Sequence, residues 1–490
     1  MIRLENVHFQ YGDENENNGA LHDINLEIPS GQAVLFCGES GCGKTTITRL
    51  INGLIPHFYE GRLTGKIRVD GQEIQSQELY DTAKIVGTVF QNPRSQFFNV
   101  DTRSEVAFGL ENQGIREAEI LKRVNQTVTE FQMESLMDRS IFELSGGEKQ
   151  KIACACVSTS SPEVFVLDEP SANLDAHSMK LLHNMILRWK QQGKTIVIAE
   201  HRLAYIWNLI DRVIFLESGK IAKDMQPAEF LKLSETELHS MGLRSNNEQK
   251  ISKMHKATDI KNIEFKDITF GYKKGKQILD ISKIQIPEHE ITAIIGHNGL
   301  GKSTFLRCIC GLEKKCKTRM IKNGAMIKRK KCLAECFLVM QDVNHQLFTE
   351  SVLDEVLISM EQEDKEKAQE ILAELDLLEY AGRHPISLSG GQKQRVAVAT
   401  AIASERDILL FDEPTSGLDY KHMLQVSAIF QKLKAKGKTI IVVTHDMEFI
   451  EAISANIIEL NTNSVKNYAQ KEFREEVDCN EKEKLPAEVI

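Results

Sequence analysis

Gly38-Glu39-Ser40-Gly41-Cys42-Gly43-Lys44-Thr45-Thr46 follows the apolar run 33–37 and precedes the helix-forming run 47–51. The spacing is that of a phosphate-binding loop, in which glycines fold the backbone tightly and successive N–H groups face a polyphosphate. The dipole of the following helix adds positive potential at the same place. Lys44 is placed to reach the terminal phosphates, and the Thr45 hydroxyl is placed to bind Mg²⁺. The stretch predicts a nucleotide site between a buried strand and a helix.

A second glycine-rich loop repeats this pattern in the other half of the chain. Gly296-His297-Asn298-Gly299-Leu300-Gly301-Lys302-Ser303-Thr304 follows the apolar run 291–295. Other landmarks recur at nearly constant separations, which indicates a tandem duplication. The separations are 258 positions for Lys44 and Lys302, 250 for Gln91 and Gln341, and 244 for Ser145 and Ser389, for Asp168 and Asp412, and for His201 and His445.

Composition and charge limit the class of protein. The chain has 490 residues, of which 41% are hydrophobic and 27% charged, as expected for a soluble globular protein of several domains. It has no run near the ~18 to 20 apolar residues that a membrane-spanning helix needs, and its first residues do not resemble a signal peptide. The net charge of −9 argues against bulk nucleic-acid binding. None of the ten cysteines forms a paired C-x₂-C zinc motif. The lack of an export signal favours a reducing cytoplasm.

Each half alternates strand-like and helical segments. Residues 2–9 and 263–270 alternate apolar and polar side chains, while 164–167 and 408–411 are continuously apolar. Apolar strands that alternate with helices indicate an α/β fold whose parallel sheet is covered on both faces. We expect a first domain at 1–222, a linker at 223–261, a second domain at 262–465 and a polar tail at 466–490.

Two further motifs occur once in each half. Asp168-Glu169-Pro170 and Asp412-Glu413-Pro414 follow the apolar strands, so their carboxylates are expected at the edge of the sheet where open α/β sheets bind ligands. There the first acid can hold Mg²⁺ and the second can polarise an attacking water. Leu144–Gln150 and Leu388–Gln394 place a serine hydroxyl and glycine N–H groups at a helix start, which suits an anion.

Together these motifs resemble those of the ATP-binding cassette (ABC) ATPases, over nearly the whole chain. The resemblance implies two tandem P-loop NTPase domains, each with a parallel-sheet core, an antiparallel β subdomain and a helical subdomain. It also implies an enzyme that hydrolyses ATP with Mg²⁺. Tyr11 and Tyr272 match the aromatic residue that stacks on adenine, Gln91 and Gln341 the glutamine that senses Mg²⁺ and the attacking water, and His201 and His445 the histidine that contacts the γ-phosphate.

The resemblance assigns the site residues to three groups. The catalytic residues are Glu169, His201, Glu413 and His445. The nucleotide-binding residues are Tyr11, Gly38, Gly41, Gly43, Lys44, Thr45, Thr46, Gln91, Ser145, Gly146, Gly147, Tyr272, Gly296, Gly299, Gly301, Lys302, Ser303, Thr304, Gln341, Ser389, Gly390 and Gly391. The Mg²⁺ ligands are Thr45, Gln91, Asp168, Ser303, Gln341 and Asp412.

In this family two cassettes pack head to tail, so that the serine motif of one closes over the nucleotide of the other. The resemblance therefore implies an intramolecular pair, in which Ser389 closes the site of Lys44 and Ser145 closes that of Lys302. Asn173 stands where the second copy has Gly417, a difference that allows unequal rates at the two sites. Both full sets of catalytic residue types are present.

The segments around the two glutamines narrow the resemblance. Val89–Phe98 with Ser104–Gly109, and Gln341–Glu350 with Asp354–Val356, are similar to the ATPases of energy-coupling-factor (ECF) transporters in their fused two-cassette form. ECF transporters import vitamins and transition-metal ions. The resemblance implies two partners, a transmembrane scaffold subunit and a small membrane protein that captures the substrate. It implies no nucleic-acid partner and a peripheral place on the cytoplasmic face of the cell membrane.

Two other classes of paired-cassette ATPase stay open. Soluble translation factors are the first, but they usually carry a long, highly charged helical linker, whereas the connection at 223–261 is mixed in composition. Fused ATPases of other importers, such as sugar importers, are the second. In those one site is commonly degraded, and here both motif sets are intact.

Overall fold

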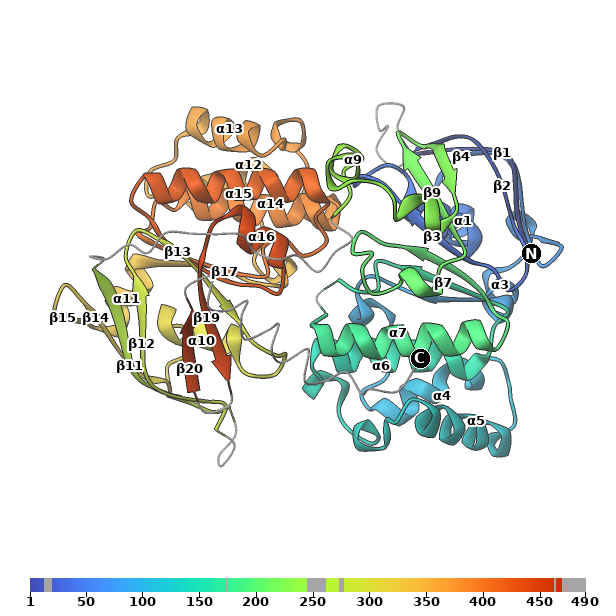
Figure 1. Ribbon diagram of the computed structural model, residues 1–490, viewed down its shortest axis with the longest axis horizontal. Coiled ribbons are helices and arrows are strands. Elements are labelled where there is room, and N and C mark those ends of the chain that lie inside the picture. The colour runs from blue at the N-terminus through green and yellow to red at the C-terminus, as the bar shows by residue number, and fades with distance from the viewer. Residues whose placement is uncertain (13–19, 173, 245–260, 273–276, 462–463, 469–490) are drawn as a thin grey trace. The chain divides into compact units, whose positions relative to one another are not determined.

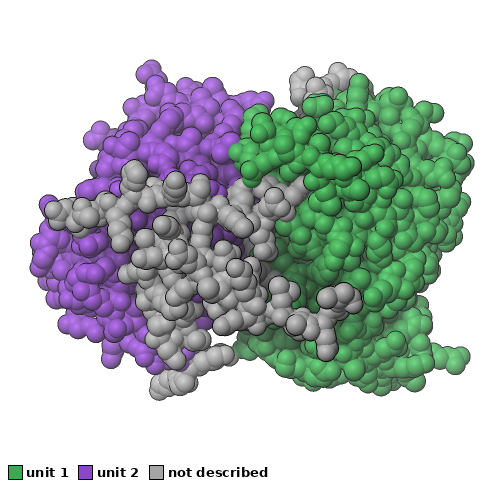
Figure 2. Space-filling view, viewed as in Figure 1, with its two compact units in different colours: residues 1–248, 419–421 green, residues 249–418, 422–490 purple. Residues whose placement is uncertain are grey.

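The computed structural model describes residues 1–12, 20–172, 174–244, 261–272, 277–461 and 464–468. The chain divides into two compact units, residues 1–248 with 419–421 and residues 249–418 with 422–490 (Figure 2). Each unit contains a four-stranded sheet and a six-stranded sheet, and Figure 1 labels many of their strands and helices. This is the α/β fold that the sequence predicts.

The first unit begins with an antiparallel sheet of order β2-β1-β4-β5. Along β1 buried and exposed side chains largely alternate, because one face of the sheet packs on the core. The strands are β1 (Ile2–Tyr11), β2 (Leu21–Ile28), β4 (Gly61–Val69) and β5 (Gln72–Glu73).

A six-stranded sheet of order β10-β9-β3-β8-β7-β6 forms the centre of the first unit. Its strands are β3 (Ala33–Cys37), β6 (Val86–Val89), β7 (Val164–Asp168), β8 (Thr195–Ala199), β9 (Arg212–Glu217) and β10 (Lys220–Met225). β3 runs parallel to β8 and β9, and β10 is antiparallel to β9. Every side chain of β3 is buried, because Leu35 and Cys37 pack into one apolar cluster and Val34 and Phe36 into another.

The helices of the first unit follow the strands in chain order. They are α1 (Lys44–Ile51), α2 (Leu54–His57), α3 (Leu79–Ile85), α4 (Thr102–Asn112), α5 (Glu117–Glu130), α6 (Gly146–Ser160), α7 (Ala176–Gln191), α8 (Pro227–Phe230) and α9 (Glu235–Ser240). α4 and α5 pack on α6 and form the helical part of the unit. α1 starts where the phosphate loop ends and packs beside β7 and β8.

The second unit repeats this plan. Its antiparallel sheet has the order β12-β11-β14-β15, and its six-stranded sheet the order β16-β17-β18-β13-β19-β20. The strands are β11 (Asn262–Phe270), β12 (Leu279–Pro287), β13 (Ile291–Ile295), β14 (Lys317–Lys322), β15 (Ala325–Ile327), β16 (Cys336–Val339), β17 (Ile408–Asp412), β18 (Thr439–Val443), β19 (Asn456–Asn461) and β20 (Ser464–Tyr468). The helices are α10 (Lys302–Cys310), α11 (Arg329–Glu335), α12 (Val352–Leu357), α13 (Lys365–Glu374), α14 (Gly390–Ala403), α15 (Tyr420–Ala435) and α16 (Met447–Ala452).

The shortening of the second half lies partly just after the phosphate-loop helix. In the first unit α1 is joined to β4 through residues 52–60, which include α2. In the second unit α10 is joined to β14 through residues 311–316, without a helix. The first unit therefore carries an extra segment beside its phosphate loop.

The segment expected as a linker is structured in its first part. β10 extends to Met225, and α8 and α9 follow it. Phe230, Leu238 and Leu243 are buried in the core of the first unit, because these apolar side chains recur through an otherwise polar stretch. Residues 245–260 of that segment, and 469–490 of the expected tail, lie outside the described residues. In the described part of the chain, every helix is too short or too polar to cross a membrane.

Candidate nucleotide sites

The loop from Gly38 to Lys44 lies between the buried strand β3 and the helix α1. Gly38, Gly41 and Gly43 have φ angles of +146°, +82° and +107°, which residues with side chains rarely adopt. A Cβ on Gly38 would also lie 2.3 Å from the carbonyl oxygen of Leu216. Glycine is therefore required here, and it allows the loop to fold as a phosphate-binding loop does.

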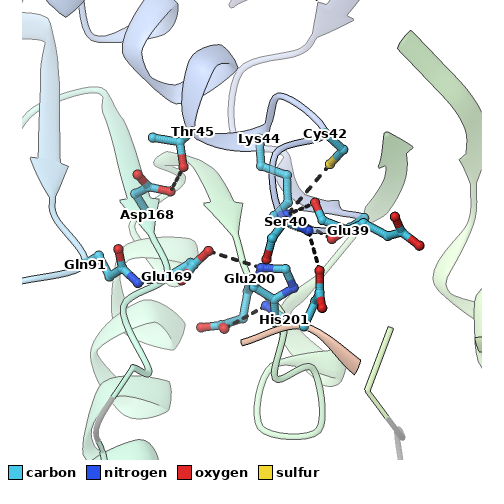
Figure 3. A network of polar contacts seen from close by, with 12 residues as sticks. Glu39, Ser40, Cys42, Lys44, Thr45, Gln91, Asp168, Glu169, Glu200 and His201 are labelled. Carbon is cyan, nitrogen blue, oxygen red and sulfur yellow. Dashed lines mark hydrogen bonds and ion pairs between the residues drawn. The ribbon is translucent and has the colours of Figure 1, made fainter. Parts of the chain in front are cut away.

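The ammonium group of Lys44 lies over this loop. Its Nζ donates hydrogen bonds to the carbonyl oxygens of Gly38 and Glu39, both over 2.8 Å, and its side chain is buried (Figure 3). In the second unit Nζ of Lys302 donates to two carbonyl oxygens of its own loop, over 2.6 and 3.0 Å. Both loops thus hold a positive charge above their backbone, where terminal phosphates can bind.

An aspartate ends the strand next to each loop. Oδ1 of Asp168 accepts a hydrogen bond from the Thr45 hydroxyl over 3.1 Å. Burial, followed by repulsion from Glu169, raises the pKa of Asp168 to about 7. Burial also raises the pKa of Asp412 to about 6, against the opposing effect of its hydrogen bond with Ser303. Each carboxyl therefore lies in a place where a cation would offset the cost of burying its charge.

Glu169 lies between a glutamine and a histidine (Figure 3). Gln91 donates from Nε2 to Oε2 of Glu169 over 2.7 Å, and Nε2 of His201 lies 3.2 Å from Oε1. Burial acts to raise the pKa of Glu169, but attraction to His201 and to Lys44 together outweigh it, so the pKa lies below its usual value. The backbone φ of Glu169 is +46°, which is uncommon outside glycine. An ionised carboxylate held in this way can act on a water molecule.

The second unit repeats the acid and the histidine, but here the histidine also contacts the phosphate loop. Nε2 of His445 lies 3.7 Å from Oε1 of Glu413 and 3.1 Å from Oδ1 of Asn298, a residue of the phosphate loop. The φ of Glu413 is +51°, as at the first site. Gln341 follows β16 as Gln91 follows β6. The structure therefore brings the predicted acid, histidine and phosphate loop together in both units.

A buried carboxylate outside the predicted site holds the histidine of the first unit. Glu200 accepts hydrogen bonds from the N–H groups of His201 (2.8 Å) and Arg202 (3.1 Å) and from the hydroxyl of Tyr205 (3.1 Å). The corresponding residue 244 positions on is Thr444. Because the second half has no acid there, the repeat could not reveal Glu200. The sequence clue to the role of Glu200 is its position, because it is an acidic residue directly after the apolar strand β8.

The aromatic residues expected at adenine lie beside the phosphate-loop helices. The hydroxyl of Tyr11 is 3.3 Å from Oγ1 of Thr46, and the hydroxyl of Tyr272 is 3.3 Å from Oγ1 of Thr304. These four residues come from corresponding places in the two units. The tyrosines therefore belong to the same sites as Lys44 and Lys302.

Each serine motif begins a helix. Ser145 caps α6 and Ser389 caps α14, each in a capping box with the residue three positions later, Glu148 or Gln392. The first residues of these helices are Gly146 and Gly147, and Gly390 and Gly391. The Ser145 hydroxyl accepts a hydrogen bond from the N–H of Glu148, and the N–H of Ser145 donates to the Glu148 carboxylate. That Ser145 closes the site of Lys302, and Ser389 the site of Lys44, stays a prediction.

The residues present fit a nucleotide with Mg²⁺. Oδ1 of Asp412 is buried without a hydrogen-bond partner among the described residues, so its lone pairs are available to a cation. Ser303 at the second site, and Asp168 with Thr45 at the first, offer the oxygen ligands that Mg²⁺ prefers. The glycine-rich loops, with the ammonium groups of Lys44 and Lys302, supply the groups that bind phosphate.

Comparisons with known proteins identify the family. The family model described as "ABC transporter" matches residues 21–172 and 279–416. A Treponema denticola protein that carries the name of an ABC transporter ATP-binding protein is 47% identical over 470 residues, which cover 94% of this chain and 95% of that protein. A second T. denticola protein of the same description is 38% identical over 458 residues, covering 92% and 93%.

One solved structure, a model of ribosome-bound archaeal Pelota and ABCE1, shares the fold of both units. It matches with a TM-score of 0.69 and 23% identity over 97% of this chain and 80% of that chain, a likeness that concerns the fold alone. The two family matches fall on the two copies of the phosphate loop and acidic pair. ATPases of this family use ATP with Mg²⁺. The chain belongs to the ABC transporter family, as an ATP-binding protein and ATPase with two cassettes in one polypeptide.

Proposed function

We propose that this ATPase energises an ECF-type importer of a vitamin or a transition-metal ion, at the cytoplasmic face of the membrane. Its proposed partners are a multi-span scaffold subunit and a small substrate-capture subunit. The observation that carries the proposal is an exposed apolar patch that recurs beside the glutamine segment of each unit. We call it the coupling patch, formed by Phe98 and Phe142 in the first unit and by Phe348 and Ile386 in the second.

The side chains of the coupling patch are among the most exposed apolar side chains of the described residues. The exposed fractions are 75% for Phe98, 77% for Phe142, 72% for Phe348 and 70% for Ile386. Single exposed apolar residues are common on protein surfaces, but paired ones at matching places in two units indicate a binding surface. Aromatic and aliphatic side chains suit the apolar helices of a membrane protein's cytoplasmic loops.

Backbone hydrogen bonds bring the two parts of each patch together. The N–H of Thr102 donates to the carbonyl oxygen of Arg139 over 3.0 Å, which places the segment of Phe98 beside that of Phe142. In the second unit the N–H of Val352 donates to Arg383 over 2.9 Å. The same pairing therefore builds the patch in both units.

A buried glutamate ties each patch to the segment that carries the glutamine. Glu105 accepts hydrogen bonds from the N–H of Phe98 (3.0 Å) and of the next residue (2.6 Å). Glu355 accepts from the N–H of Phe348 (3.0 Å) and of the next residue (2.9 Å). Both glutamates are 3% exposed. Because Gln91 contacts Glu169 at one end of this segment, a shift at the nucleotide site can reach the patch through a short, tightly bonded chain.

The proposed work of the site follows from its residues. Lys44 and Lys302 bind the terminal phosphates, while Glu169 and Glu413 polarise the attacking water. The acids at the ends of β7 and β17, with the adjacent hydroxyls, hold Mg²⁺, which neutralises phosphate charge when it is bound. The serine motif of each cassette closes the nucleotide site of the other. ATP binding then closes the pair, and hydrolysis lets it open.

The competing proposal is a ribosome-associated ATPase. A partner rich in RNA requires a broad basic surface. The chain has a formal net charge of −9, and the repeated surface beside the glutamines is apolar. These observations favour a membrane protein as the partner.

Affinity purification of the full chain from native membranes tests the proposal. The wild-type chain should recover a multi-span membrane protein. The double variant Phe98→Ser with Phe348→Ser should lose that partner while retaining its basal ATPase rate, because both side chains lie on the surface and outside the nucleotide sites.

The matched control replaces two other exposed apolar side chains, Leu121→Ser and Met326→Ser, which are 50% and 65% exposed and lie outside the patch. This variant should recover the scaffold protein as the wild type does. Recovery of ribosomal proteins in place of a membrane protein would overturn the proposal, as would undiminished scaffold recovery by the Phe98→Ser, Phe348→Ser variant.

A further inference from the structure

The extra segment of the first unit places a tyrosine beside the adenine-site tyrosine. Tyr59 lies in the connection from α2 to β4, and its ring meets that of Tyr11 edge-on, with 6.4 Å between centroids. The neighbouring Phe58 packs edge-on against Tyr59 at 5.0 Å. Phe58 is 69% exposed, so this aromatic group reaches the surface of the unit.

Arg49 of helix α1 joins the two tyrosines. Its guanidinium lies over the ring of Tyr59, 3.9 Å from the centroid, which is a close cation–π contact. The same guanidinium donates from NH1 to the hydroxyl of Tyr11 over 2.9 Å. Thr46 contacts that hydroxyl as well, at 3.3 Å. The ring of Tyr11 is therefore held through its hydroxyl and by the edge-to-face contact with Tyr59.

Within the described residues of the second unit, the counterpart of Arg49 makes a different contact. Arg307, 258 positions after Arg49, donates instead to Glu313 over 2.8 Å. The connection 311–316 carries no aromatic residue. The contacts that the structure gives Tyr272 run to Thr304 and, edge-on at 4.8 Å, to Phe270 of its own sheet. Tyr272 is 54% exposed.

We infer that Arg49 and Tyr59 are positioning residues that hold Tyr11 ready for the nucleobase, so that the first cassette binds ATP more tightly than the second. A side chain that is ordered in advance does not lose its freedom on binding, and that loss otherwise weakens the complex. Ordering one side chain in advance corresponds to roughly a three- to tenfold lower dissociation constant for ATP. The inference rests on the stacking role of Tyr11 and is independent of the proposed transport partner.

Photolabelling of the purified full chain with 2-azido-ATP tests it, because the labelled peptides distinguish Tyr11 from Tyr272. In the wild type the peptide of Tyr11 should reach half-saturation at a concentration roughly three- to tenfold lower than the peptide of Tyr272. Arg49→Ala and Tyr59→Ala should raise the half-saturation concentration of the Tyr11 peptide toward that of the Tyr272 peptide. Labelling of the Tyr272 peptide should stay unchanged and so reports that the chain is folded.

Two matched variants separate positioning from general loosening of the unit. Tyr59→Phe keeps the ring under Arg49 and should behave as the wild type. Arg307→Ala changes the corresponding residue of the second unit and should alter neither half-saturation value. Equal half-saturation concentrations for the two peptides of the wild-type chain would overturn the inference. An Arg49→Ala chain whose Tyr11 peptide is labelled as in the wild type would overturn it as well.

Inorganic tripolyphosphate supplies the final readout because it lacks a base. Positioning of Tyr11 predicts that Tyr59→Ala weakens ATP binding at the first site and leaves the inhibition constant of tripolyphosphate, corrected for the weaker binding of the label, at its wild-type value. A loosened phosphate loop would weaken both ligands equally, and that result would contradict the inference. Because no membrane protein is present, failure here and failure of the transport proposal are distinguishable.

Discussion

Gln91 donates a hydrogen bond from Nε2 to Oε2 of Glu169 over 2.7 Å, and so links the segment of the coupling patch to the acidic pair. The two residues are 78 positions apart and follow different strands, β6 and β7, which pair in parallel. In the proposed function this bond couples the nucleotide site to the patch. Four predictions follow from this and related contacts.

Gln91→Ala should slow hydrolysis at the first site by about tenfold, because Glu169 loses the donor that orients its carboxylate. The dissociation constant for ATP should rise by a smaller factor than hydrolysis slows, since Lys44 and the rest of the phosphate loop stay intact although Gln91 is a predicted Mg²⁺ ligand. Stopped-flow phosphate release and equilibrium ATP binding measure the two quantities. A large loss of ATP affinity with normal turnover of bound ATP would contradict the assigned role.

Glu169→Gln combined with Glu413→Gln should lower the rate of ATP hydrolysis by at least about a hundredfold, because an amide cannot accept a proton from water. ATP should still bind, since both lysine-bearing loops stay intact. Glu163→Gln, an exposed carboxylate that pairs with Lys194, is the matched control and should hydrolyse normally. Hydrolysis by the double variant at the wild-type rate would remove the base assignment from both glutamates.

Glu200→Thr installs the residue of the second unit and should destabilise the first unit by about 1 to 3 kcal/mol, because three N–H groups and a hydroxyl lose a buried acceptor. The chain has two tryptophans, Trp189 and Trp207, and both lie in the first unit. Their fluorescence during urea unfolding therefore reports on this unit. Glu217→Thr, an exposed carboxylate on β9, should leave the midpoint unchanged, and an unaltered midpoint for Glu200→Thr would contradict the role of Glu200.

Cys316 should react with N-ethylmaleimide before Cys42, although Cys42 belongs to the phosphate loop. Burial raises the pKa of Cys42, and Lys44 offsets this only in part. A hydrogen bond with Cys308 lowers the pKa of Cys316, whose side chain is partly exposed. More thiolate at neutral pH means faster alkylation. Peptide mapping by mass spectrometry at pH 7.5 measures both rates.

In Cys316→Ser the alkylation rate of Cys42 should stay at its wild-type value, because the two thiols belong to different units. Modification of Cys42 ahead of Cys316 in the wild-type chain would show that the phosphate loop opens more readily than its packing indicates.

The sequence by itself determined the duplication, the α/β fold and the residue types of both sites. Local pattern suffices for these, because a continuous apolar run forms a buried strand and a glycine-rich loop between strand and helix has few alternative structures. The sequence also predicted that each acidic pair ends a strand beside its phosphate loop, as Asp168 does beside Thr45.

The tertiary structure decided which side chains meet across long separations. The repeat could not show that Glu200 holds the loop of His201, or that Arg49 joins Tyr11 to Tyr59, because the second half has Thr444 in place of Glu200 and no counterpart of Tyr59. The exposure of Phe98 and Phe348 likewise depends on how neighbouring segments pack. Such contacts arise from the packing of segments far apart in the chain, which local periodicity does not encode.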